Sequence, residues 1–275
     1  MRPIEVHGLR KRYGARTAVD GIDLTVEPGE VFALLGPNGA GKTTTVEILE
    51  GHRRRDGGDV SVLGADPGTA GRRWRARIGV VLQTATDAAE LTVRESVRHY
   101  AGYYPRRRDP DEVIAAVGLE GQAGQRVGTL SGGQRRRLDV ALGIVGRPEL
   151  VFLDEPTTGF DPEARRQFWD LIRSLAADGT TVLLTTHYLD EAEALAARLA
   201  VLAGGRIVAV GTPQTVGGRD RAPAVVSWRD SDGLHAVHTD EPDAVVAGLA
   251  GGFADLRVTR PTLEDTYLSL IGESR

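Results

Sequence analysis

Eight residues rich in glycine constrain this chain more than any other segment, namely Gly36-Pro37-Asn38-Gly39-Ala40-Gly41-Lys42-Thr43. An apolar run at residues 31–35 precedes them, and residues 43–49 have the pattern of a helix start. Glycines allow consecutive backbone N–H groups to point at one anion, and a helix N-terminus adds partial positive charge. The octapeptide therefore predicts a strand, a phosphate-binding loop and a helix, which form the nucleus of an α/β fold.

Lys42 and Thr43 carry side chains suited to the phosphates of a nucleoside triphosphate and to Mg²⁺. We expect Lys42 to bridge the β and γ phosphates and the Thr43 hydroxyl to ligate the metal. Lysine occurs only at positions 11 and 42, and every other Lys or Arg position is arginine, which hints that position 42 needs a compact ammonium. The alternative is an ordinary glycine turn capped by threonine, which the flanking strand and helix disfavour.

A second candidate site is acidic. It follows another apolar strand, residues 150–153, which ends in Asp154 and Glu155. Adjacent residues of a strand point to opposite sides, so these two carboxylates divide the work rather than chelating together. We expect Asp154 to hold Mg²⁺ through water and Glu155 to polarise the attacking water. The alternative is a strand followed by an acidic helix cap.

The order of elements predicts an α/β fold of the P-loop NTPase type. Short strands at residues 1–35 indicate an antiparallel β subdomain, and the alternation of strands and helices after residue 149 indicates a parallel sheet covered by helices. We expect an ATPase domain at residues 1–215 with a helical insertion at about 84–146. Glycines and prolines at 211–223 predict a linker, and residues 224–275 predict a small α+β C-terminal appendage.

Composition limits the classes of function that remain open. The chain has 275 residues, a formal net charge of -4 and no cysteine, so thiolate chemistry and Cys-ligated metals are excluded and no nucleic-acid partner is expected. No apolar run reaches the roughly 18 residues of a membrane span, and the N-terminus lacks the pattern of a secretory signal. We expect a cytoplasmic protein that reaches a membrane only through another polypeptide.

The segment Leu130-Ser131-Gly132-Gly133-Gln134 resembles the signature motif of ATP-binding-cassette (ABC) proteins. The resemblance implies that two copies of the chain sandwich two ATP molecules. In such a homodimer, Ser131, Gly132, Gly133 and Gln134 contact the γ phosphate held by the other copy.

Further positions match the ABC pattern in order and spacing over roughly residues 2–211. Tyr13 is similar to the aromatic residue that stacks on adenine. Gln83 is similar to the catalytic glutamine that senses Mg²⁺ and links the ATPase core to the helical insertion. Asp161, in a loop expected to cross the dimer interface, and His187, similar to the switch histidine at the γ phosphate, complete the match. The remaining ATP contacts implied by the resemblance come from Asn38, Gly39, Ala40, Gly41, Lys42, Thr43 and Thr44.

Within the ABC family, residues 51–67 and 260–267 resemble the ATPases of two-component drug and antibiotic-resistance exporters. This resemblance implies a separate integral membrane permease as partner and a peripheral position on the cytoplasmic face of the plasma membrane. The alternative is a cassette ATPase that acts on nucleic acid or the ribosome. Such proteins usually carry long coiled coils, zinc-binding cysteines or two cassettes, and this chain has a single P-loop and no cysteine.

Overall fold

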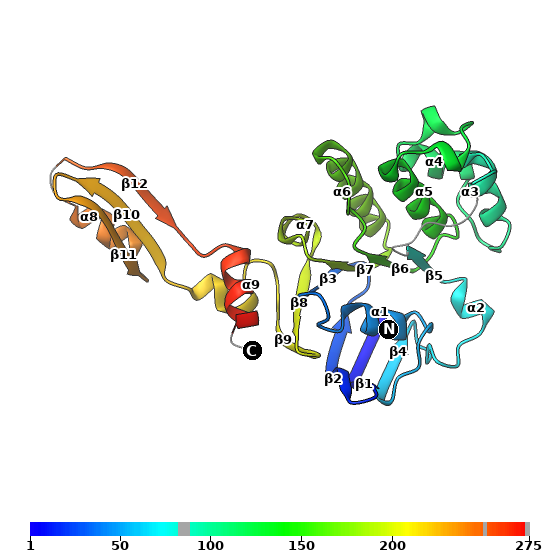
Figure 1. The fold of residues 1–275 in the computed structure, drawn as a ribbon, viewed down its shortest axis with the longest axis horizontal. Coiled ribbons are helices and arrows are strands. Elements are labelled where there is room, and N and C mark those ends of the chain that lie inside the picture. The colour runs from blue at the N-terminus through cyan, green and yellow to red at the C-terminus, as the bar shows by residue number, and fades with distance from the viewer. Residues whose placement is uncertain (82–88, 250–251, 273–275) are drawn as a thin grey trace.

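The computed structural model describes residues 1–81, 89–249 and 252–272, and these residues form three sheets (Figure 1). The central sheet has six described strands in the order β5-β6-β7-β3-β8-β9. All neighbours pair in parallel except β8 and β9, which are antiparallel. The bounds of these strands are β3 (Val31–Leu35), β5 (Ile78–Val81), β6 (Leu150–Asp154), β7 (Thr181–Thr186), β8 (Arg198–Ala203) and β9 (Arg206–Gly211). The predicted α/β class is confirmed.

The central strands are apolar throughout because both faces of the sheet are covered. In β6, Val151 and Leu153 join the core formed with the helices, whereas Leu150 and Phe152 join the core formed with the N-terminal sheet. Figure 1 shows these two layers on opposite faces of the central sheet. A continuous apolar strand is the expected result of two-sided burial.

The predicted antiparallel β subdomain is an N-terminal sheet of β1 (Ile4–Tyr13), β2 (Arg16–Val26) and β4 (Gly57–Val62) in the order β2-β1-β4. Helix α1 (Lys42–Leu49) directly follows the octapeptide and buries Val46, Ile48 and Leu49 with this sheet. The helix therefore joins the phosphate loop to both sheets.

The opposite face of the central sheet carries α3 (Val93–Ala101), α4 (Pro110–Ala116), α5 (Gly132–Ile144) and α6 (Pro162–Ala177) (Figure 1). The short helices α2 (Arg72–Arg75) and α7 (Leu189–Leu195) flank the sheet elsewhere. Local sequence sets several helix starts: Thr92 and Glu95 form a capping box at α3, and Asp109 caps α4 before Pro110. The helical character expected for residues 84–146 is present in the described part of that range.

The mostly apolar pattern of residues 199–210 predicts a single strand, and this prediction is wrong. The structure has two antiparallel strands, β8 and β9, which are separated by Gly204 and Gly205. Both glycines have a positive φ, 56° and 80°, which allows the tight turn of a hairpin. The apolar run continued across the turn and concealed it.

The C-terminal sheet, β11-β10-β12, extends away from the rest of the molecule with α8 (Pro242–Gly248) on it (Figure 1). Its strands are β10 (Ala224–Asp230), β11 (Gly233–Thr239) and β12 (Ala254–Thr259). The segment predicted as a linker contains the 3₁₀ helix η3 (Val216–Arg221), whose Val216 is buried with Leu263 of helix α9 (Leu263–Gly272) and with β3 and β8. Helix α9 thus returns to the central sheet after the chain has left it.

Replacing Leu263 by Ala is expected to destabilise the protein by about 2–4 kcal/mol, because a buried Leu loses its transfer free energy and leaves a cavity. Leu263 is 1% exposed, whereas Leu268 on the same helix is 54% exposed. The matched control Leu268→Ala should change the free energy of unfolding by less than about 0.5 kcal/mol. Urea denaturation of both variants measures the difference, and equal effects would contradict the packing of α9 on the core.

Candidate active site

The octapeptide surrounds a pocket of about 540 Å³ at the N-terminus of α1. Ten residues line it: Tyr13, Arg16, Ala18, Asn38, Gly39, Gly41, Lys42, Thr43, Thr44 and Glu155. They come from the β1–β2 hairpin, the octapeptide, the start of α1 and the end of β6. The fold therefore brings together eight of the residues predicted from the sequence to contact ATP or to act on it, namely Tyr13, Asn38, Gly39, Gly41, Lys42, Thr43, Thr44 and Glu155.

Two glycines of the loop stand where no side chain would fit. A Cβ on Gly36 would lie 2.4 Å from the carbonyl oxygen of Leu202, and a Cβ on Gly41 would lie 2.4 Å from that of Ala18. Gly41 also has a φ of 107°, which L residues rarely adopt. The loop therefore keeps its shape only with glycine at these positions, where β2 and β8 press against it.

The Lys42 ammonium points back into the loop. Its Nζ donates to the carbonyl oxygens of Gly36 at 2.6 Å and Pro37 at 3.3 Å. Burial lowers the pKa of Lys42, while the nearby carboxylates of Glu155 and Asp154 act to raise it. The residues present fit a nucleotide phosphate chain, because the buried cation and the turned backbone form a positively polarised cradle.

The acidic pair occupies two different environments at the end of β6. Asp154 accepts a short hydrogen bond from the Thr185 hydroxyl on β7, while Glu155 leaves the strand with a φ of 45°. The Glu155 N–H donates to the Thr185 carbonyl oxygen at 3.0 Å, and its Oε1 lies 3.2 Å from His187 Nδ1. The fold thus places Glu155 and His187 as neighbours although they are far apart in sequence.

Tyr13 presents an accessible ring at the mouth of the pocket. The ring is 40% exposed, and the Arg53 guanidinium lies 5.3 Å from its centroid. Arg16, which the sequence analysis did not select, lines the same pocket and donates to the Gly39 carbonyl oxygen at 3.0 Å. Arg16 pairs with Tyr13 across the hairpin. Only a prediction of the strand register of this hairpin could have identified Arg16 as a residue of the pocket.

The signature segment lies outside the lining of this pocket. Ser131 caps α5: its hydroxyl oxygen accepts from the Gln134 N–H at 3.2 Å, and the Gln134 side chain accepts from the Ser131 N–H. Ser131 and Gly132 are exposed. The segment therefore presents free N–H groups and a hydroxyl at a helix start on the protein surface.

Comparison with known proteins decides the family. The family model described as "ABC transporter" matches residues 19–158, half of the chain, from the β1–β2 region through the acidic pair. The chain belongs to the ABC transporter family. It is an ATP-binding cassette, the ATPase subunit of such a transporter.

Relatives of this cassette align along nearly its whole length. It is 39% identical over 295 residues to Nod factor export ATP-binding protein I of Burkholderia pseudomallei (strain 1710b), with 98% of this chain and 97% of the relative covered. It is 40% identical over 305 residues to daunorubicin resistance ATP-binding protein DrrA3 of Streptomyces coeruleorubidus, with 99% and 96% covered. A solved ATP-binding subunit of an ABC transporter superposes with a TM-score of 0.70 and 28% identity over 77% of this chain and 90% of that chain.

Two further predicted positions of the cassette, Asp161 and Ala40, lie outside the lining of the pocket. Asp161 caps α6, where its carboxylate accepts from the Ala164 N–H at 2.8 Å. Ala40, which belongs to the octapeptide, is buried and does not line the pocket. Gln83 lies outside the described residues.

The short basic clusters at residues 53–55, 106–108 and 135–137 predict solvated surfaces, and Arg136 of the cassette departs from this prediction. Its guanidinium is buried and donates to the carbonyl oxygens of Asp154 at 2.6 Å and Pro156 at 3.1 Å. The contact joins α5, which begins at the signature segment, to the strand end that carries the acidic pair. A triplet of arginines in sequence does not reveal which one turns inward.

A buried carboxyl group lies behind the cassette's phosphate loop. Glu50 follows α1 and is almost fully buried, and burial, with smaller contributions from Asp154 and Glu47, raises its pKa to about 8 from an ordinary value of 4.5. The His52 ring Nδ1 lies 3.2 Å from Glu50 Oε2. The folded protein therefore retains this proton at pH values at which the unfolded chain has released it.

This shift predicts that the stability contributed by protonated Glu50 is complete below about pH 4.5 and is lost as the pH rises through about 8. Glu50→Gln removes the titrating group and keeps a similar shape. Between pH 5 and pH 8 the free energy of unfolding of the parent protein should fall relative to that of the variant by roughly 1–4 kcal/mol. Denaturant titrations at both pH values measure this difference, and parallel pH profiles would contradict the assignment.

Proposed function

We propose that the chain binds and hydrolyses Mg²⁺-ATP as a homodimer and drives export of a small molecule through a separate membrane permease. The observation that carries the proposal is the separation of the signature segment from the P-loop pocket of the same chain. The signature segment offers a second surface for an anion outside the P-loop pocket. Two copies that face each other would bring this surface of one copy to the P-loop pocket of the other.

The proposed chemistry is attack of water on the γ phosphate, for which the protein supplies positioning and charge. Lys42 binds the β and γ phosphates, and Glu155 accepts the proton of the attacking water while His187 orients the γ phosphate and Glu155. Bound Mg²⁺ supplies charge neutralisation of the β and γ phosphates. Thr43, which lines the pocket, and Asp154, aligned by Thr185, are suited to hold the metal, together with Gln83.

The proposed dimer places Ser131, Gly132, Gly133 and Gln134 of one copy on the γ phosphate bound to the other. The exposed capping box supports this role, because it fixes the helix start while leaving donors free. Asp161 caps α6 in the loop that the ABC resemblance places at the same interface. Tyr13 stacks on the adenine, and Asn38, Gly39, Ala40, Gly41 and Thr44 surround the phosphates.

The named relatives support a separate permease partner. In the described part of the chain, no helix is long and apolar enough to cross a membrane. The two relatives named above are an export protein and a drug-resistance protein, and both align with the C-terminal region as well as with the cassette. We therefore assign a drug-like or antibiotic-like cargo and a peripheral position on the cytoplasmic face of the plasma membrane.

The proposed domain division is an ATPase domain at residues 1–215, with the helical insertion at 84–146, and an accessory domain at 224–275. The C-terminal sheet supports an accessory unit, because its strands pair only with one another among the described residues. Helix α9 packs on the ATPase core with Leu263 and Leu270, so it serves as the anchor of that unit.

Glu155→Gln is expected to reduce the ATPase rate by about 100-fold or more, because the base that takes the proton is lost. ATP binding should persist and the dimer should accumulate, since the phosphate cradle is unchanged. Phosphate release, equilibrium binding of ATP and light scattering measure the three properties. Glu264→Gln, an exposed carboxylate on α9, is the control, and a Glu155→Gln variant with the parent rate would refute Glu155 as the base.

The transport function is tested by isolating the tagged chain from detergent-solubilised membranes of its host and identifying bound proteins by mass spectrometry. A polytopic membrane protein in near-equal amount is expected. Its recovery should be lost when the chain is omitted and retained with Glu155→Gln. Recovery of ribosomal or nucleic-acid-bound proteins alone would preserve the ATPase chemistry and overturn the transporter assignment.

A further inference from the structure

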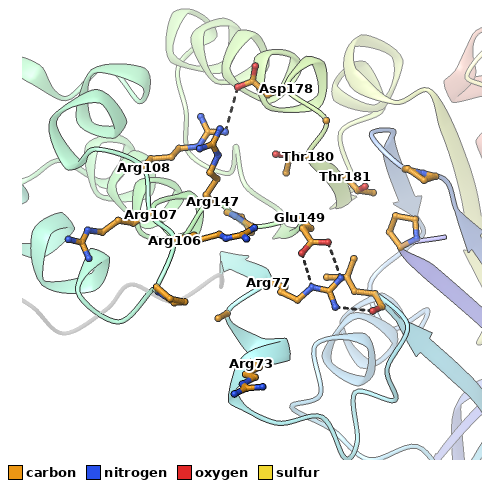
Figure 2. Close-up of a pocket in the computed structure, with 18 of the residues that line it drawn as sticks. Arg73, Arg77, Arg106, Arg107, Arg108, Arg147, Glu149, Asp178, Thr180 and Thr181 are labelled. Carbon is orange, nitrogen blue, oxygen red and sulfur yellow. Dashed lines mark hydrogen bonds and ion pairs between the residues drawn. The ribbon is translucent and has the colours of Figure 1, made fainter. Parts of the chain in front are cut away.

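A second large pocket lies on the side of the central sheet opposite the phosphate loop. It has a volume of about 980 Å³ and borders Glu149 and Thr181, at the amino ends of β6 and β7. The phosphate loop follows the carboxyl end of the parallel strand β3, so the two pockets occupy opposite edges of one sheet. We call this second site the arginine pocket, after the guanidinium groups that Figure 2 shows around it.

Positive charge is concentrated here although the chain as a whole has a net charge of -4. Among the described residues that line the pocket, arginines outnumber carboxylates by seven to four. The arginines are Arg2, Arg73, Arg77, Arg106, Arg107, Arg108 and Arg147, and the carboxylates are Asp109, Glu112, Glu149 and Asp178. The site therefore has an excess of three positive charges.

The carboxylates leave several of these arginines uncompensated. Glu149 pairs with Arg77 through two contacts, 2.7 and 2.9 Å, and Asp178 lies 3.5 Å from Arg108 (Figure 2). Asp109 is occupied as the cap of α4. Within the described residues, no carboxylate oxygen lies within 4.0 Å of the guanidinium nitrogens of Arg73, Arg106, Arg107 or Arg147, although the Arg106 charge helps to lower the pKa of Glu149.

The backbone that carries these side chains is held in place. Arg147 has a φ of 51°, and the preceding Gly146 cannot accept a Cβ because the Tyr104 ring would lie 2.5 Å from it. The Arg108 N–H donates to the Val145 carbonyl oxygen at 2.9 Å and joins the 106–108 loop to the 145–147 turn. The buried Arg108 Nε has no hydrogen-bond partner among the described residues, so a buried donor faces this region unsatisfied.

Guanidinium groups suit phosphate because their planar fork makes two parallel hydrogen bonds to the oxygens of a phosphate or a carboxylate, and they keep their positive charge. The contrast within this chain is informative, since its two lysines are at positions 11 and 42, whereas this pocket has arginine alone. A concave site of this size suits a phosphorylated group rather than the long stripe that a nucleic-acid backbone needs.

We propose that the arginine pocket binds a phosphate-bearing anion, held by Arg106, Arg107 and Arg147 with Arg73 at its edge. The phosphate comes from the headgroup of an anionic phospholipid or from a free phosphorylated molecule. The site is separate from the ATP pocket and does not depend on the proposed transport function.

Two probes distinguish the two sources, both applied to the full chain with ADP and Mg²⁺ saturating the ATP site. Inorganic pyrophosphate, followed by titration calorimetry, represents the free phosphate. Co-sedimentation with vesicles of equal parts phosphatidylcholine and phosphatidylglycerol, compared with phosphatidylcholine alone, represents the lipid. Binding of one probe identifies the source, and binding of neither by the parent chain overturns the proposal.

The decisive variant is Arg106→Gln/Arg107→Gln/Arg147→Gln, which should weaken binding of the effective probe by roughly tenfold or more. The control Arg166→Gln/Arg257→Gln/Arg260→Gln removes the same charge from exposed arginines elsewhere and should change binding less than about twofold, since exposed distant charges are screened. Equal losses in the two triple variants would reduce the effect to net charge and overturn the site.

ATPase activity reports whether each variant is folded, because none of these arginines lines the ATP pocket. If the triple Gln variant loses ATPase activity, Arg106→Lys/Arg107→Lys/Arg147→Lys replaces it. This variant keeps the charge and loses the forks, so the same probe should bind several-fold more weakly. Unchanged binding by the folded Lys variant would overturn recognition by guanidinium geometry.

Discussion

The close approach of three backbone segments at the phosphate loop is the constraint on which the rest of the structure depends. Gly36 lies against the Leu202 carbonyl of β8, and Gly41 lies against the Ala18 carbonyl of β2. Because a single methyl group at either position would collide with backbone, the N-terminal sheet, the loop and the central sheet have one relative placement. That placement brings Tyr13 and Arg16 of the hairpin to the mouth of the pocket.

At the carboxyl end of the central sheet, burial and neighbouring charges act in opposite directions on the pKa of Lys42. Burial disfavours the Lys42 ammonium, and Glu155 and Asp154 favour it. Behind them, Glu50 is neutral near pH 7 because burial and the same Asp154 raise its pKa.

The two pockets are lined by different charged groups. The ATP pocket combines one buried lysine, turned glycines and the Glu155 carboxylate, which suits a triphosphate whose hydrolysis products must be released. The arginine pocket has unpaired guanidinium groups and no counterpart of the glycine cradle. Arg136, in contrast, is buried between α5 and the end of β6, and its hydrogen bonds join the helix that begins at the signature segment to the strand end that carries the acidic pair.

The sequence by itself determined the α/β class and the local structure of the segments that form the proposed ATP site. Glycine spacing, an apolar strand before it and an acidic pair after another apolar strand are local patterns, and each reflects backbone geometry that neighbouring residues decide. Strand boundaries were not determined where an apolar pattern continued through a turn, as at Gly204 and Gly205. Burial gives the strands on both sides of a hairpin a similar apolar character.

Only the tertiary structure decided which distant side chains meet. The contact of Glu155 with His187, the inward turn of Arg136 and the return of α9 to the central sheet join residues between about twenty and two hundred positions apart. The arginine pocket has the same origin, because its side chains come from α2, the α3–α4 loop and the start of β6. Short arginine runs are similar in sequence wherever they occur, and whether they are solvated, buried or gathered around a cavity depends on what the fold places beside them.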